Sequence, residues 1–152
     1  NLHHHRDARH KMGDDLRLSF AVLSGLSASD YLDAQRLRTA LREEMRALLS
    51  GVDLLALPTT QTTAPELPVS QRGRSFADTA AIDAMCRFAF VGNLTGLPAG
   101  TAPVGDEDGL PIGFQLMADA FREADILGAL AHLGRIGLAE VRRPKAALDL
   151  LG

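Results

Sequence analysis

Apolar positions along the chain recur at spacings that predict the order of helices and strands. Leu16, Phe20 and Leu23 stand at helical spacing and predict a helix over about residues 14–24. A second and clearer helix is predicted over residues 27–50, with an apolar stripe that we expect to be core. The stripe consists of Ala34, Leu37, Leu41, Met45 and Leu48.

Polar residues support the limits of this second helix. Ser27 stands three residues before Asp30, which is the spacing of a capping box with Asp in place of Glu, and Gly51 is a suitable stop. The basic residues of the helix are expected to form a solvated face with Glu43 and Glu44 nearby, not a nucleic-acid patch. They are Arg36, Arg38, Arg42 and Arg46.

The middle of the chain alternates between a short apolar run, a loop and a helix. Residues 52–58 are a bounded apolar run, which predicts a strand buried on both faces. Residues 59–74 are rich in Thr, Pro and Gly and predict a long loop. Residues 75–91 have helical spacing, and residues 93–98 are expected to break that helix.

The last part of the pattern predicts a hairpin and a final helix. Residues 99–104 and 110–117 are two predicted strands around a turn marked by Asp108 and Gly109. A helix is predicted over residues 119–136, and residues 141–152 are expected near the surface. This order predicts an α/β fold with helices packed on a mixed β-sheet.

Composition narrows the class of protein without identifying a function. The chain has 152 residues, 46% hydrophobic and 23% charged, which suits one globular domain. Its net charge of −3 predicts neither direct nucleic-acid binding nor attraction to an anionic membrane. No long apolar run predicts a membrane span, and the polar start does not resemble a signal peptide. A single cysteine, Cys86, makes a reducing cytoplasm the simplest expected location.

Three stretches in series resemble the amidase-signature family. The first runs from Asp30-Tyr31 down the helix to Asp53-Leu54-Leu55-Ala56-Leu57-Pro58-Thr59-Thr60. The second is Asn93-Leu94-Thr95-Gly96-Leu97-Pro98, and the third is Gly109-Leu110-Pro111-Ile112-Gly113-Phe114-Gln115-Leu116. The resemblance covers about residues 10–137. It implies that residues 1–152 are the carboxy-terminal portion of a single amidase-signature domain.

The resemblance also implies where the chemistry lies. Family members cleave amides with two Ser residues and a Lys, upstream of the matched region, and use a Gly-Gly-Ser-Ser-Gly type stretch. No Gly-Gly-Ser stretch occurs here, and the only lysines are Lys11 and Lys145. Because a Ser hydroxyl needs an adjacent base and an oxyanion needs positioned donors, we expect no catalytic residue in this chain and no amidase activity from it alone. No cofactor is expected. Because residue 1 is Asn, we expect the chain to begin inside a longer reading frame or to follow processing.

Some residues are expected to shape the substrate pocket of the parent protein. Thr59 and Thr60 follow a strand end, where α/β sheets present ligands. Asn93, Thr95 and Gly96 are expected to form a turn that faces the same pocket.

The substrate class is predicted from one departure from the family pattern. In glutamine-using members an Asp stands seven residues before the equivalent of Asn93, and this chain has Cys86 there, with Asp83 one helical turn earlier. We therefore expect a small or aryl/alkyl amide as substrate of the parent. A glutamine-dependent amidotransferase of the A-subunit type is the alternative.

The His and Cys residues suggest two further kinds of site, and each has a simpler explanation. His3, His4, His5 and His10 suggest a metal site, but consecutive His side chains do not converge from a regular element, so a solvated segment and no metal site are predicted. Cys86 with His132 suggests a cysteine nucleophile, but Cys86 lies on an apolar helix, where an inert thiol is the rule.

A third hypothesis is a non-catalytic structural or interaction fragment. Strands near residues 54–57 and 112–116 would lose neighbours if the sheet were incomplete, and would expose backbone and apolar surface. We therefore expect the chain to form a homo-oligomer.

Overall fold

The computed structural model describes residues 9–66 and 79–140, and it confirms the predicted α/β class. After a short 3-10 turn (Arg9–Lys11) come α2 (Asp14–Leu23), α3 (Ala28–Leu49), β1 (Leu55–Pro58), α4 (Thr79–Cys86), α5 (Ala89–Thr95), β2 (Ala99–Glu107), β3 (Leu110–Met117) and α6 (Glu123–Arg135). His3 to His5, Lys145, the end of the predicted 59–74 loop and the tail lie outside the described residues.

The sheet has three described strands in the order β1-β3-β2, and both pairings are antiparallel. The predicted hairpin between β2 and β3 is confirmed. Asp108 and Gly109 have φ values of 53° and 82°, the left-handed conformation that a two-residue hairpin turn needs. The ladder shifts register between Pro103 and Gly105, so β2 carries a bulge and runs further than the predicted 99–104.

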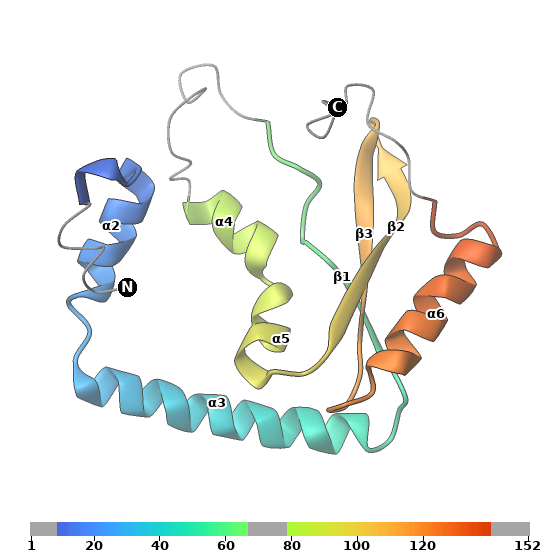
Figure 1. Cartoon of the computed structure of the whole chain (residues 1–152), viewed down its shortest axis with the longest axis horizontal. Coiled ribbons are helices and arrows are strands. Elements are labelled where there is room, and N and C mark those ends of the chain that lie inside the picture. Colours follow the sequence, from blue (N-terminus) through green and yellow to red (C-terminus); the bar gives the residue numbers. More distant parts are fainter. Residues whose placement is uncertain (1–8, 67–78, 141–152) are drawn as a thin grey trace.

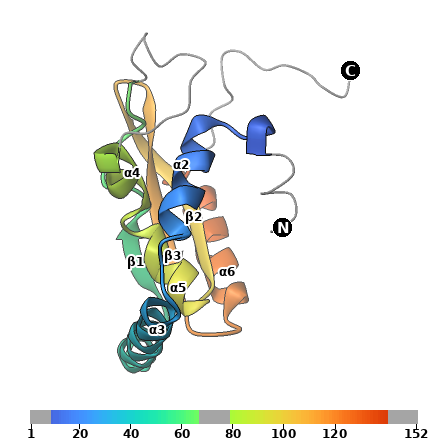
Figure 2. The ribbon, with the colours of Figure 1, turned by 90° about the vertical axis from the view of Figure 1, so that its left-hand side faces the viewer.

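Helices cover the two faces of this sheet unequally. Figures 1 and 2 show α6 on one face, and α4 and α5 on the other. The buried cluster lies beneath α6 and joins Leu116, Ala118 and Ile126, with Phe114 and Leu130 packed against it. The hairpin and α6 therefore form the packed core of the described chain.

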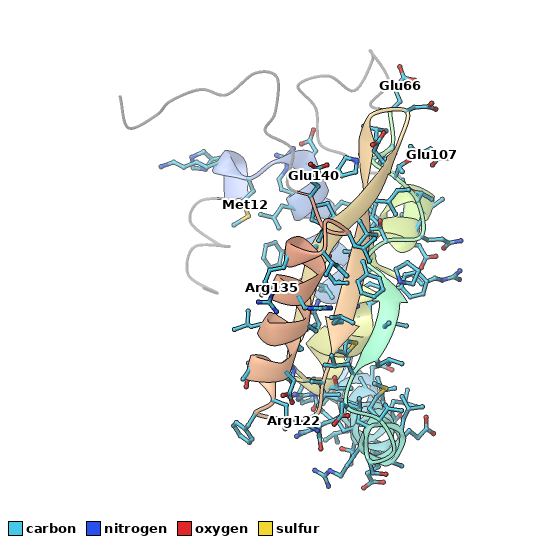
Figure 3. All side chains as sticks on the ribbon, turned by 90° about the vertical axis from the view of Figure 1, so that its right-hand side faces the viewer. Met12, Glu66, Glu107, Arg122, Arg135 and Glu140 are labelled. Carbon is cyan, nitrogen blue, oxygen red and sulfur yellow. The ribbon has the colours of Figure 1, made fainter. Side chains whose placement is uncertain are left out.

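Glu66 and Glu107 lie at the end of the molecule opposite Arg122 (Figure 3).

Gly100 permits the close approach of α6 to β2. A Cβ at this position would lie 2.6 Å from Ile126 Cγ2 and 3.0 Å from Leu130 Cδ1. Contacts that short force side chains or backbone to move. Gly100 is thus needed for the packing of α6 against β2.

The start of α3 confirms the predicted capping box. The Ser27 hydroxyl accepts from the backbone N–H of Asp30 at 3.1 Å, and the Asp30 carboxylate accepts from the backbone N–H of Ser27 at 2.8 Å. The carboxylate also accepts from the Ser27 hydroxyl, and these bonds lower the pKa of Asp30. The half of the box that the Asp30 carboxylate accepts is therefore strongest while Asp30 is ionised, whereas the bond from the Asp30 N–H to the Ser27 hydroxyl does not depend on that charge.

The predicted core stripe of α3 is only partly buried in this chain: Leu41 and Met45 are half-buried, and the other members are exposed. Leu37 is 73% exposed and Leu48 50% exposed, whereas Leu49 is 4% exposed. The helix contacts α5 through a face that includes Arg38, whose Nε donates to the carbonyl oxygen of Leu94 at 2.6 Å. Arg38 is therefore not part of a purely solvated face, because it binds the C-terminal turn of α5.

Two more predictions need correction. The 52–58 strand is not buried on both faces, because Ala56 and Pro58 are exposed and β1 is at the edge of the described sheet. The helix predicted over 75–91 is divided into α4 and α5, and residues 93–95, predicted to break a helix, are the last turn of α5. Gly96, with φ of 73°, ends it.

Among the described residues, none of the helices combines the length and apolar character that crossing a bilayer requires.

Candidate functional site

Thr59 lies on the face of the sheet that α4 and α5 share, beside a second threonine on β2. The hydroxyl oxygens of Thr59 and Thr101 are 2.5 Å apart, and Thr101 also donates to the carbonyl oxygen of Phe114 at 3.1 Å. The Thr59 backbone N–H donates to the carbonyl of Gly113 at 2.9 Å. The two hydroxyls thus meet across the central strand.

Gly113 makes this meeting possible. A Cβ at Gly113 would lie 2.6 Å from Thr59 Oγ1 and 2.7 Å from Thr59 Cβ. Any larger residue at this position would push the Thr59 side chain away from the sheet. Gly113 therefore contributes to the site by leaving room for the Thr59 side chain, and not through a contact of its own.

The loop that follows Thr59 is attached to the end of α4. The Thr60 hydroxyl donates to the carbonyl of Thr62 at 2.7 Å, so its proton is used within the loop. The backbone N–H of Gln61 donates to the carbonyl of Ala84 at 3.0 Å, and Arg87 Nη1 donates to Gln61 Oε1 at 3.1 Å. These bonds bring an exposed guanidinium next to the loop that carries Thr59 and Thr60.

Gln115 is a buried polar residue at the centre of the same face. It pairs with Leu57 on β1 and with Thr101 on β2, and it is 8% exposed. Its Nε2 has no hydrogen-bond partner among the described residues. A buried donor without a partner costs roughly 1–3 kcal/mol, so Gln115 places a polar group on this face that the described residues leave unsatisfied.

The residues predicted around the 93–96 turn have other roles in the described structure. Thr95 is 4% exposed, and its hydroxyl donates to the carbonyl of Val91 at 2.6 Å. Gly96 supplies the left-handed helix end, with its N–H on the carbonyl of Gly92 at 2.8 Å. Asn93 is exposed on α5. Thr95 and Gly96 therefore hold the end of α5 in place.

The structure does not bring the two predicted groups together. Thr59 lies over Gly113, whereas a Cβ at Gly92 on α5 would lie 3.8 Å from the Met117 side chain. Met117 lies four positions after Gly113 on β3, which corresponds to about 13 Å. Within this chain the Thr59 region and the end of α5 are thus separate places on one face.

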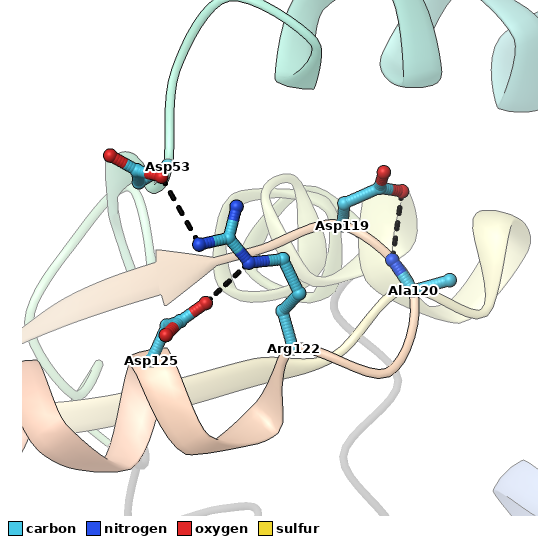
Figure 4. Close-up of polar contacts among 5 residues, drawn as sticks. All are labelled: Asp53, Asp119, Ala120, Arg122 and Asp125. Atoms are coloured by element: carbon cyan, nitrogen blue, oxygen red, sulfur yellow. Dashed lines mark hydrogen bonds and ion pairs between the residues drawn. The ribbon is translucent and has the colours of Figure 1, made fainter.

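An ion-pair cluster joins the segment before β1 to α6 at the other end of the sheet (Figure 4). Arg122 Nη2 contacts Asp53 Oδ1 at 3.1 Å, and Arg122 Nε donates to Asp125. The bond to Asp125, and then that to Asp53, raise the pKa of the Arg122 guanidinium. The cluster is exposed and its charges are paired with one another, which is typical of a structural clamp and not of a catalytic group.

Among the described residues, the other candidates for chemistry are Cys86, His10, His132 and Asp83. Cys86 is a half-buried free thiol at the end of α4, and both His10 and His132 are exposed. Within residues 9–66 and 79–140, no three His, Cys, Asp or Glu side chains gather as metal ligands do. Asp83, the predicted substitute for an acidic substrate contact, lies on α4.

Thr101, Arg87 and Gln115 were not predicted as site residues. The register that places Thr101 beside Thr59 follows from the bulge and turn of the hairpin, and the Arg87 contact follows from the path of the loop after Thr60. A polar residue in the middle of an apolar strand, as Gln115 is, was the one signal that the sequence offered.

Comparisons with known proteins show which family and which solved structures the chain resembles. A family profile described as Amidase matches residues 5–127. A "Fatty acid amide hydrolase" of Oryza sativa subsp. indica is 36% identical over 99% of this chain and 25% of its own length. The A subunit of a glutamyl-tRNA(Gln) amidotransferase of Legionella pneumophila (strain Paris) is 40% identical over 72% of this chain and 21% of its own length.

A solved structure described as that of an amidase superposes with a TM-score of 0.73 and 25% identity, over 89% of this chain and 31% of that one. The chain thus spans about a quarter of the length of the two curated relatives, and about a third of this solved chain.

Proposed function

The chain belongs to the amidase family, and from this premise we propose that it is the carboxy-terminal part of a hydrolase domain that cleaves carbon–nitrogen bonds of amides. The observation that carries the proposal is the 36% identity with a fatty acid amide hydrolase over almost the whole chain. In this proposal a Ser-Ser-Lys apparatus outside these residues supplies the nucleophile and base. This chain supplies part of the sheet and one wall of the pocket.

Thr59 and Thr60 are the proposed wall. They follow β1, and the hydrogen bonds of Thr59 to Thr101 and Gly113 hold that wall against the sheet. A pocket wall that is fixed before substrate arrives positions the substrate without further ordering. Asn93 is a weaker candidate, because Thr95 and Gly96 beside it are occupied in ending α5.

We propose a neutral aryl or alkyl amide as substrate instead of an amino-acid amide. The chain has Cys86 where the family resemblance implies an acidic contact for a substrate ammonium group, and Arg87 is next to it. The Arg87 guanidinium donates to Gln61 in the loop of the proposed wall. A cation near the site repels an ammonium group, so it disfavours glutamine.

A glutamine-using amidotransferase is the second candidate. The observation that favours it is the 40% identity with the amidotransferase chain of Legionella pneumophila. It requires an acidic contact for the ammonium group, and Asp83 on α4 is the acidic side chain nearest in sequence to Cys86.

A chimera tests the proposal. The matched segment of the rice fatty acid amide hydrolase would be replaced by this chain, with the unaltered enzyme as the control for expression and activity. We expect turnover of an anilide or alkyl amide, little turnover of glutamine, and none from the 152-residue chain alone. A folded chimera that cleaves no amide, or amide turnover by the isolated chain above a buffer control, contradicts the proposal.

We also propose that the isolated chain forms a homo-oligomer through α3. Ala34, Leu37, Leu41 and Leu94 line a groove of about 460 Å³ with Arg38 and Glu44 beside them. In a symmetric pair, Arg38 of one copy can face Glu44 of the other while Leu37 becomes buried. Ultracentrifugation of the chain and of Leu37→Asp tests this. A wild-type chain that stays monomeric at high concentration rules it out.

A further inference from the structure

The hydrogen-bond direction in the Thr59–Thr101 pair is fixed by its third member. A backbone carbonyl has no proton, so Thr101 must donate in its 3.1 Å bond to the Phe114 oxygen. A hydroxyl has a single proton, and that of Thr101 is then used. At an oxygen–oxygen distance of 2.5 Å, Thr59 must therefore be the donor to Thr101.

This direction determines what Thr59 presents to its surroundings. Its proton points at Thr101, so the Thr59 oxygen has only lone pairs left and acts as an acceptor. Without the Thr101 hydroxyl, Thr59 would be free to rotate and to donate. Gly113 keeps the two side chains at this distance, because any Cβ there would displace Thr59.

We propose that Thr101 is a positioning residue that makes Thr59 an acceptor for an N–H group of the substrate. This inference rests on the proposed function, in which Thr59 is part of the pocket wall, and it names the substrate class more narrowly. Primary and secondary amides carry the required N–H, whereas tertiary amides do not. Gln115, buried beside Thr101 with its Nε2 unpaired among the described residues, adds a second polar group to the same face.

The test uses the 152-residue chain and two small probes, acetamide and N,N-dimethylacetamide, with binding followed by NMR shifts of Thr59. We expect acetamide to bind about two- to tenfold more tightly, the ratio that one neutral hydrogen bond supplies. In Thr101→Val the freed Thr59 hydroxyl can also donate to the carbonyl oxygen of either probe, so we expect the preference for acetamide to fall. Thr101→Ser keeps the hydroxyl and is expected to keep the preference.

Each outcome decides the proposal. Equal binding of the two probes to the wild-type chain, no shift at Thr59 with either probe, or an unchanged preference in Thr101→Val overturns it. If Thr101→Val unfolds, Thr59→Val replaces it and must abolish the preference while Thr60→Val does not. Because the readout is binding at Thr59 and not turnover, failure of the chimera leaves this result unaffected, and the reverse also holds.

Discussion

Helices α3 and α6 are both amphipathic, yet α6 buries its apolar stripe within this chain more fully than α3 does. Ile126 of α6 is 3% exposed and packs on Leu116 and Ala118, whereas Leu37 and Leu48 of α3 are at least half exposed. Both stripes follow the helical period. The period of a pattern thus identifies the face of a helix that prefers burial, but not the chain segment that buries it.

The two helices also differ in how much they contribute to the stability of this chain. The hairpin and α6 supply their own core, whereas α3 has one buried residue, Leu49, and contacts α5. We infer that the exposed face of α3 is covered by a partner, either the remainder of an amidase domain or a second copy. If so, substitutions around α6 should cost more stability than substitutions on α3.

The largest effect is expected from removing the centre of the α6 core. Ile126→Ala should lower the free energy of unfolding by about 2–5 kcal/mol, through lost burial and a cavity. The neighbouring Leu127 is 66% exposed, so Leu127→Ala is a matched control with a change within about 0.5 kcal/mol. Urea denaturation measures both. Equal losses would mean that α6 does not pack as described.

Overpacking at Gly100 comes next. Gly100→Val places atoms inside contact distance of Ile126 and Leu130 and should cost about 1–3 kcal/mol. Gly105 on the same strand has nothing within 4 Å of a Cβ, so Gly105→Ala is the control and should be close to neutral. Thermal unfolding compares them. If both variants unfold at the same temperature, the close approach of α6 to β2 is wrong.

Loss of the α3 cap should have a smaller and pH-dependent effect. Ser27→Ala should cost about 1 kcal/mol of helix stability. The folded-state pKa of Asp30 lies below its ordinary value of 3.8, so the carboxylate's share of the cap is present above that value and is lost as the pH falls through the folded-state pKa. Circular dichroism below about pH 4 should therefore show less acid-induced helix loss in Ser27→Ala than in the wild type. An identical acid titration would exclude this coupling.

The smallest effect is expected at Arg122. Its ion pairs with Asp53 and Asp125 are exposed, and solvent and salt screen such pairs. Arg122→Gln should lower the melting temperature slightly at low salt, and the difference from wild type should vanish at high salt. A large loss that does not depend on salt would show that Arg122 has a packing role.

Local signals in the sequence predicted the hairpin, the Ser27 cap and both long helices, because each depends on residues close together in the chain. The exposure of Ala56 and Pro58 and the Arg38 bond to Leu94 depend on distant segments, so the local pattern did not predict them. Of the candidate site, Thr59 and Thr60 remain predictions that a strand end suggested. The position of Thr101 beside Thr59 could be recognised only once the register of β2 against β3 was known.

Hydrogen exchange of the isolated chain, at a concentration where it is monomeric, tests most directly whether α3 needs a partner. We predict strong protection of amides in β3 and α6 and much weaker protection along α3, because only the first two share a buried core. Protection of α3 should rise when the chain self-associates or is built into the chimera. Equal protection of α3 and α6 in the monomer would contradict the claim that α3 needs a partner.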